Sequence, residues 1–134
     1  MADKVLKLNI MTPDRTFYDG EASMVEFTST EGELGIYPGH IPLASIVAPG
    51  VLTIHEAGGE VKKAALHSGF AKISTDEIMI LAEVIEWPDE IDINRANEAK
   101  ERAQRRLSGK DSGLDIQRAE LALKRSLTRI SLKG

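Results

Sequence analysis

Cysteine is absent from the 134 residues of the chain, and aromatic residues make up only 4% of them. The absence of cysteine excludes disulfide bonds and thiolate metal sites. The three histidines are His40, His55 and His67, and their separations match no compact metal-binding motif. We therefore expect structural or surface roles for these histidines and no requirement for a metal.

Long apolar runs are also missing. No stretch approaches the roughly 20 apolar residues that a membrane-spanning helix needs, and the first residues lack the unbroken apolar segment of a signal peptide. We therefore expect a protein that is soluble, or that partners hold at a membrane without direct insertion.

Motifs of nucleotide hydrolysis and covalent catalysis do not occur either. Residues 31–40 contain three glycines, but the Gly-Lys-Ser/Thr ending of a phosphate-binding P-loop does not follow. No serine lies in a Gly-x-Ser-x-Gly nucleophile elbow. We expect no active site in this chain, and we interpret residues 31–40 as a rigid surface loop in which glycine supplies positive φ.

Charge is divided unevenly along the chain. Residues 1–94 contain 6 Lys/Arg and 16 Asp/Glu, whereas residues 95–134 contain 11 Lys/Arg and 5 Asp/Glu. This asymmetry indicates two surfaces for different partners, although a solvated pair of basic helices would explain it equally well. Because the basic part has no aromatic side chain for base stacking and the acidic part repels phosphate, we expect no nucleic-acid partner.

Residues 1–87 have the pattern of a β domain. Polar and apolar residues alternate over 4–10, and short β-rich runs follow at 24–28, 51–55, 61–66, 70–73 and 77–81. Gly58-Gly59 and Ser74-Thr75-Asp76 separate neighbouring runs, which is typical of hairpin turns. Many short strands with close turns predict an antiparallel sandwich or barrel.

The period changes after Pro88, which cannot donate to a strand ladder. Asp92 is a suitable N-cap, and an apolar stripe made mostly of alanine follows at helical spacing over 96–107. A loop at 108–113 leads to a second helix that we expect to begin near Asp115. The pattern therefore predicts two domains, a β domain at 1–87 and an αα-hairpin at 88–134.

The alanine stripe also bears on how firmly the hairpin is held. Burial of alanine returns little hydrophobic free energy, so we expect a hairpin that docks weakly on the β domain and can move. A tightly docked helical cap is the alternative.

Basic residues cluster on the second helix. Arg125 and Arg129 lie one turn apart, Lys124 precedes Arg125, and Arg95 could face them across the hairpin. Clustered guanidinium groups suit a phosphate between them, although an exposed basic face without a ligand is the alternative. The motif Asp-x-x-Arg-Ala occurs at 92–96 and again at 115–119, so it also describes an ordinary helix start and does not by itself identify a ligand.

Several runs resemble those of the epsilon subunits of bacterial F-type ATP synthases. The most specific is EGELGIYPGHIPL at 31–43, and shorter matches are TPD at 12–14, SGF at 68–70 and RAELALKR at 118–125. The resemblance implies a flattened β-sandwich of about ten strands followed by two helices. It also implies a peripheral position on the cytoplasmic side of the bacterial cell membrane, at the foot of the central stalk. There the chain would contact the gamma subunit and the c-ring, with Glu33 and His40 facing the polar loops of the ring.

The hairpin resembles the movable inhibitor of this family. Folded on the sandwich, it would permit ATP hydrolysis; extended along gamma into the alpha/beta catalytic head, it would block rotation. Lys124, Arg125 and Arg129 would then pair with acidic segments of the beta subunits. The alternative is a purely structural coupling subunit with a fixed hairpin.

The resemblance also implies ATP as a regulatory ligand. The run IDINRA at 91–96 matches the ATP-binding motif of some family members. By position, the residues that correspond to nucleotide contacts are Glu86, Asp92, Arg95, Arg125 and Arg129. The arginines would meet phosphate oxygens, and the two carboxylates would orient the base or the start of the helix.

Overall fold

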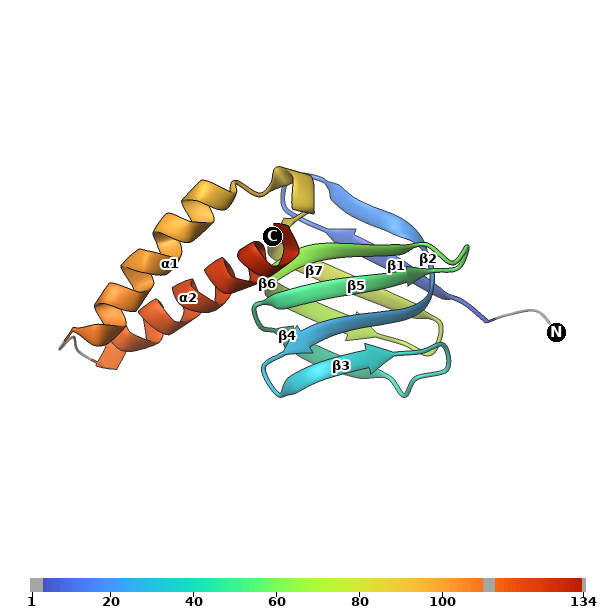
Figure 1. The fold of residues 1–134 in the computed structure, drawn as a ribbon. Coiled ribbons are helices and arrows are strands. Elements are labelled where there is room, and N and C mark those ends of the chain that lie inside the picture. Colours follow the sequence, from blue (N-terminus) through green and yellow to red (C-terminus); the bar gives the residue numbers. More distant parts are fainter. Residues whose placement is uncertain (1–3, 110–112, 134) are drawn as a thin grey trace.

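The computed structural model describes residues 4–109 and 113–133 and, within α2, side chains from Ile116 onward. In these residues the chain forms a strand domain followed by two long helices (Figure 1). The elements are β1 (Leu6–Met11), β2 (Thr16–Ser29), β3 (Gly32–Ile36), β4 (Leu43–Val47), β5 (Gly50–Glu56), β6 (Val61–Ile73), β7 (Glu77–Glu86), the 3-10 turn η1 (Pro88–Glu90), α1 (Ile93–Ser108) and α2 (Gly113–Lys133).

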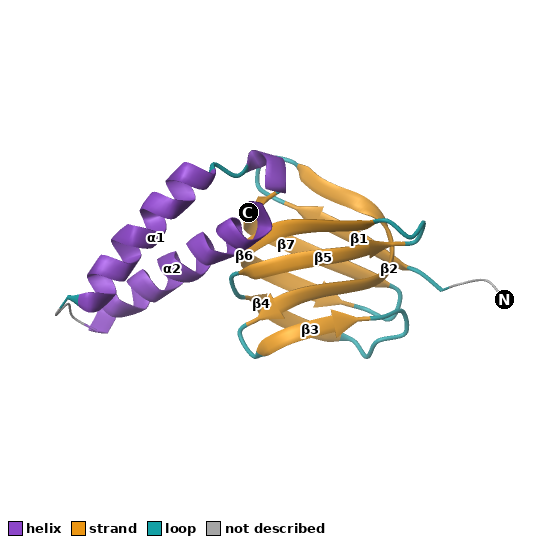
Figure 2. Ribbon diagram, in the orientation of Figure 1, coloured by secondary structure: helices purple, strands orange, loops and turns teal. Residues whose placement is uncertain are grey.

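The strands form two layers, and the predicted sandwich followed by an αα-hairpin is confirmed (Figure 2). The described residues contain seven strands where the resemblance implied about ten, because β2 and β6, of 14 and 13 residues, each pass through both layers. The start of β2 pairs with β1 and its end with β3, while the start of β6 pairs with β5 and its end with β4. Neighbouring strands are antiparallel except for β1 and β7, which are parallel.

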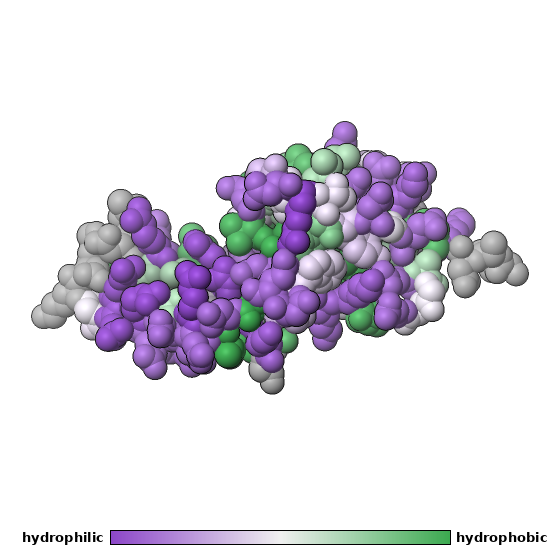
Figure 3. All heavy atoms as spheres, turned by 90° about the horizontal axis from the view of Figure 1, so that it is seen from above, coloured by the Kyte–Doolittle hydropathy of each residue, from purple (hydrophilic) through white to green (hydrophobic). Residues whose placement is uncertain are grey.

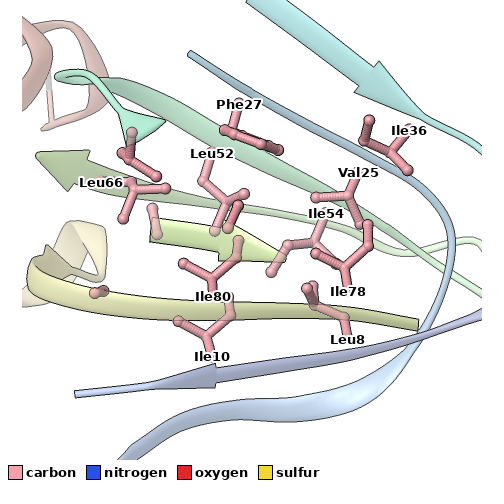
Figure 4. Close-up of a cluster of buried hydrophobic side chains, with 14 of the residues drawn as sticks. Leu8, Ile10, Val25, Phe27, Ile36, Leu52, Ile54, Leu66, Ile78 and Ile80 are labelled. Carbon is pink, nitrogen blue, oxygen red and sulfur yellow. The ribbon is translucent and has the colours of Figure 1, made fainter. Parts of the chain in front are cut away.

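The core fills the space between the layers (Figure 4). It forms because alternate side chains of each strand point inward, as in β1, where Leu6, Leu8 and Ile10 are completely buried. Each fully buried side chain of this size stabilises the fold by about 1.5–3 kcal/mol. The residues labelled in the figure are Leu8, Ile10, Val25, Phe27, Ile36, Leu52, Ile54, Leu66, Ile78 and Ile80.

Gly69 allows β6 and β7 to approach closely where their register shifts. Its φ is +147°, and a Cβ built there would lie 2.3 Å from the carbonyl oxygen of Leu81 and 2.9 Å from the Cα of Ala82. Both neighbours are backbone atoms, which cannot rotate away as a side chain would. Glycine is therefore required at this position by both conformation and space.

We expect Gly69→Ala to lower the free energy of unfolding by about 3 kcal/mol, because it combines the cost of an unfavourable φ with a backbone clash. Urea denaturation measures the loss. Gly59→Ala is the matched control, since Gly59 also has a positive φ of 98° but has no atom within 4 Å of the added Cβ. We expect about 1 kcal/mol for this control, and equal losses in the two variants would refute the role of the close approach.

The hairpin begins at Asp92, as predicted. Its carboxylate Oδ1 accepts hydrogen bonds from the backbone N–H groups of Asn94 (3.0 Å) and Arg95 (3.2 Å). Ala96 and Ala103 of the alanine stripe are buried where α1 packs along α2. The second helix begins at Gly113, two residues before the predicted start near Asp115, whose side chain lies outside the described residues, as does part of the predicted loop at 108–113.

The hairpin leans away from the sandwich, and the end of α2 lies beside β6 (Figure 1). Among the described residues, the main contacts between the hairpin and the rest of the chain run from α2 to β5, β6 and η1. Seen from above, hydrophilic side chains cover most of the hairpin surface (Figure 3). The attachment of α2 at its last turns therefore fixes the position of both helices.

Candidate functional site

A charged contact joins the end of α2 to the sandwich. Glu86, the last residue of β7, accepts a hydrogen bond through Oε1 from the Nε of Arg129 on α2 at 2.6 Å. The same oxygen lies 3.0 Å from the Nε2 of His67 on β6. The side chains of Glu86 and Arg129 are about three-quarters buried, at 25% and 26% exposure. One carboxylate oxygen thus links two strands and the second helix.

His67 is the buried member of this cluster. Its side chain is 0% exposed, and its Nδ1 is buried with no hydrogen-bond partner among the described residues. Because an ionised Glu86 can only accept, Nε2 carries a proton, and in the neutral form of the ring Nδ1 is left with a free lone pair.

The carboxyl group of Glu86 is held in its ionised form. Burial opposes ionisation, but the hydrogen bonds from His67 and Arg129 outweigh it and hold the pKa of Glu86 below its ordinary value of 4.5. Near neutral pH the contact with Arg129 is therefore an ion pair in a partly dry environment, where such pairs are screened less by salt.

This lowered pKa predicts acid release of the hairpin. Arg129 lowers the pKa of Glu86 only in the docked state, so this share of the lowering stabilises docking while Glu86 is ionised and is lost as the pH falls through the lowered pKa. Distances between spin labels on the sandwich and on α2 would show the step, and Glu86→Gln should lack it. The same step in Glu86→Gln would assign it to another carboxyl group.

A second contact lies at the end of α2, where the Nζ of Lys133 donates to the carbonyl oxygen of Pro88 at 3.0 Å. Pro88 belongs to η1, which a separate clamp attaches to the sandwich. In this clamp the Nη2 of Arg15 lies 2.9 and 2.8 Å from the two carboxylate oxygens of Glu90, and the backbone N–H of Trp87 donates to the same carboxylate. The N–H of Trp87 and the guanidinium of Arg15 hold the pKa of Glu90 below its ordinary value, against a smaller opposing effect of burial.

The ring of Trp87 is stacked on Phe17 of β2, with 4.3 Å between the centroids. Ile91, after η1, is buried as well. Residues 87–91 are therefore attached to the sandwich, and the first residue beyond them is the helix cap Asp92.

The five predicted nucleotide contacts occupy different surroundings. Glu86 and Arg129 touch, and the carboxylate of Asp92 is engaged as the helix cap. Arg95 is exposed in the first turn of α1, and Arg125 is half-buried on α2 one turn before Arg129. Within residues 4–109 and 113–133, the side chains of Arg95 and Arg125 form neither a hydrogen bond nor an ion pair.

Two of the three predicted interface residues share a surface. Glu33, exposed on β3, and Lys124, exposed on α2, both line a groove of about 1330 Å³ between α2 and the strands β2, β3 and β5. His40 is half-buried in the loop before β4, where its Nδ1 lies 2.7 Å from the carbonyl oxygen of Ile41. The structure therefore brings Glu33 and Lys124 to one surface that does not include His40.

The strand register creates a surface that the motifs did not predict. Phe70 lies opposite Ile46 of β4 and Leu81 of β7, and Leu81 lies opposite Met11 of β1. All four are exposed, at 43%, 60%, 49% and 40%, and they point away from the core. We call these four residues the outer apolar row.

The outer apolar row is a continuous cross-strand line of apolar side chains in contact with solvent. Contiguous exposed patches of this kind mark interaction sites, whereas scattered exposed apolar residues do not. The row is therefore a candidate docking surface for a partner.

Two further features concern residues 4–109 and 113–133, the part of the chain that the structure describes. Its His, Asp and Glu side chains form no group of three that could hold a metal ion. None of its helices is both long and apolar enough to cross a bilayer.

Comparison with known proteins gives a consistent match over the full chain. Residues 5–88 match the family model of the ATP synthase delta/epsilon chain β-sandwich domain, and residues 89–134 match the model of its long α-helix domain. The ATP synthase epsilon chain of Clostridium kluyveri is 48% identical over 96% of this chain and 97% of its own length. That of Halalkalibacterium halodurans is 42% identical, also over 96% and 97%.

A solved structure has the same fold. One chain of the Euglena gracilis mitochondrial ATP synthase superposes with a TM-score of 0.82, at 24% identity, over 96% of this chain and 80% of that chain.

Proposed function

The chain belongs to the family of ATP synthase delta/epsilon chains, and from this membership we propose that it is a non-catalytic rotor subunit in the central stalk of an F-type ATP synthase. It couples the catalytic head to the c-ring, peripherally on the cytoplasmic side of the bacterial membrane. Its hairpin inhibits ATP hydrolysis when it leaves the sandwich and enters the alpha/beta head. ATP binds the docked hairpin and favours the active enzyme.

The contact between Arg129 and Glu86 carries this proposal. It joins α2 directly to the sandwich, at a distance of 2.6 Å, and it is backed by the contact of Lys133 with Pro88. The described contacts of α1 are made mainly with α2. Because the hairpin is held at the last turns of one helix, few polar contacts must break for it to pass from a docked to a released state.

Arg95 and Arg125 supply the positive charge for a nucleotide. Arg95 is exposed, Arg125 is half-buried, and both lack an anionic partner among the described residues. Phosphate oxygens bound by guanidinium groups on both helices would hold α1 and α2 together near the Arg129 contact. Such a ligand shifts the equilibrium only if it binds the docked state better, which contacts from both helices and Glu86 provide.

Three surfaces divide the partners. The outer apolar row faces the gamma subunit, because permanent interfaces are more hydrophobic than transient ones and would cover these exposed apolar side chains. Glu33 on β3 and, from a separate position in the loop before β4, His40 face the polar loops of the c-ring. Lys124, together with the basic residues of the hairpin, faces acidic segments of the head when the hairpin extends.

Calorimetric titration of the full chain with ATP tests the nucleotide site. We expect micromolar-to-millimolar binding in the wild type and at least about tenfold weaker binding in Arg95→Ala, because a charge-assisted phosphate contact is lost. Arg105→Ala, which removes an exposed arginine from another face of the same helix, about 15 Å further along, is the control and should bind as the wild type does. No binding at millimolar ATP would favour a structural coupling subunit with a fixed hairpin.

A further inference from the structure

His67 is a buried titratable side chain that the proposed function leaves without a role. Its ring is 0% exposed, and its Nε2 reaches the Oε1 of Glu86 at 3.0 Å. Arg129 reaches the same oxygen from α2 at 2.6 Å. The Nε of Arg129 and the Nε2 of His67 therefore both contact the Oε1 of Glu86.

The charge balance of this cluster depends on the proton of the ring. With a neutral ring, one cation on Arg129 faces one anion on Glu86. A second proton on His67 places two cations against a single carboxylate. Since both nitrogens contact the same oxygen, they lie well inside the screening length of about 8 Å at physiological salt.

Release of the hairpin removes this conflict. When α2 leaves, Arg129 leaves with it, and a charged His67 pairs with Glu86 alone. The released state therefore binds the proton better than the docked state, and by linkage the proton weakens docking.

Other charged groups around the cluster do not reverse this sign. On η1, Glu86 weakly opposes the ionisation of Glu90, and the carboxylate of Glu90 is itself paired with Arg15. On α2, Lys133 adds positive charge on the same side at Pro88. On β5, the register position beside this part of β6 is Gly50, opposite Leu66, and carries no charge.

We propose that His67 makes docking of the hairpin sensitive to pH, so that protonation of its ring releases α2 from the sandwich. This rests on the proposed function in one respect, namely that the hairpin moves between docked and released states. Imidazole is the side chain whose charge ordinarily changes between about pH 5 and 8, so this is the interval over which docking is compared.

Distance measurements between spin labels test the inference, and the absence of native cysteine allows Glu21→Cys on β2 and Glu120→Cys on α2 as label sites. Without nucleotide, we expect the docking equilibrium constant to fall about tenfold from pH 8 to pH 5.5, within the usual range for coupled sites. His67→Gln keeps an N–H donor for Glu86 but cannot titrate, and it should stay equally docked at both values. An unchanged wild type, or a His67→Gln variant that responds as the wild type does, overturns the inference.

A second measurement leaves His67 in place. The chain has three histidines, so the ring resonances of His67 can be assigned and followed by NMR as the pH changes. In Arg129→Gln we expect the ring to take up its proton at a higher pH than in the wild type, because the competing cation is gone. Identical titrations overturn the inference. Both experiments omit ATP, so a failure to bind ATP and a failure to sense pH are told apart.

Discussion

Phe70→Asp is expected to abolish tight binding of the chain to the gamma subunit. Phe70 is 43% exposed and lies between Ile46 and Leu81 in the outer apolar row. In a complex that covers this row, the new carboxylate would be removed from water with no cation of this chain opposite it in the row. We expect a loss of about 3 kcal/mol, or about 100-fold in Kd, which is typical of a central interface position.

The measurement is the affinity of purified gamma subunit for the immobilised chain. Val61→Asp is the matched control, because Val61 is 49% exposed on the same strand but lies at its other end, beside β5. This control should bind gamma as the wild type does. A folded Phe70→Asp variant with unchanged affinity would exclude the outer apolar row as the gamma site.

Removal of the carboxylate at the hairpin attachment should have the second large effect. Glu86→Ala deletes the acceptor of Arg129 and of His67 at once. Loss of a partly buried, charge-assisted hydrogen bond is worth about 1.5–3 kcal/mol, so we expect the docked state to become about 10- to 100-fold less favoured. The label distance between sandwich and α2 should lengthen accordingly at neutral pH.

Glu83→Ala provides the comparison for this variant. Glu83 is exposed on the same strand, and no ion pair of its side chain is found in the described part of the chain. Both substitutions remove one negative charge from β7, so an effect of net charge alone would appear in both. If Glu86→Ala remains docked like Glu83→Ala, the attachment must be made by other groups.

Local patterns were sufficient to predict most of the fold. The turns at 58–59 and 74–76 join β5 to β6 and β6 to β7, and Asp92 caps α1, because each depends on residues within one hairpin or one helical turn. The continuity of β2 and β6 through both layers and the parallel pairing of β1 with β7 were not predicted. These features depend on contacts between segments that are far apart in the sequence.

The candidate site divides in the same way. The family resemblance pointed to Glu86 and Arg129, and the structure brings them together. His67 was missed as a member of the site. In a regular strand, neighbouring side chains point to opposite faces, so a buried Leu66 predicts an exposed His67. The strand register shifts between Leu66 and Ser68, and both Leu66 and His67 are buried. The pair Arg15–Glu90 spans 75 residues and has no local signal.

The outer apolar row could not be recognised from composition. Each of its four residues belongs to a strand in which apolar residues are expected. They become neighbours only through the register in which β4, β6, β7 and β1 pair. A search for apolar side chains at matching register positions would have found the row once the strand order was known.

The clamp on η1 gives the hairpin the geometry of a lever. With residues 87–91 attached to the sandwich by Glu90 and Trp87, backbone rotation on release is concentrated at Asp92. The 16 residues of α1 extend about 24 Å from that pivot, at 1.5 Å per residue. A rotation of about 20° at Asp92 therefore moves the far end of α1 by about 8 Å. Loss of the hydrogen bond between Arg129 and Glu86 can thus shift the tip of the hairpin by much more than the length of that bond.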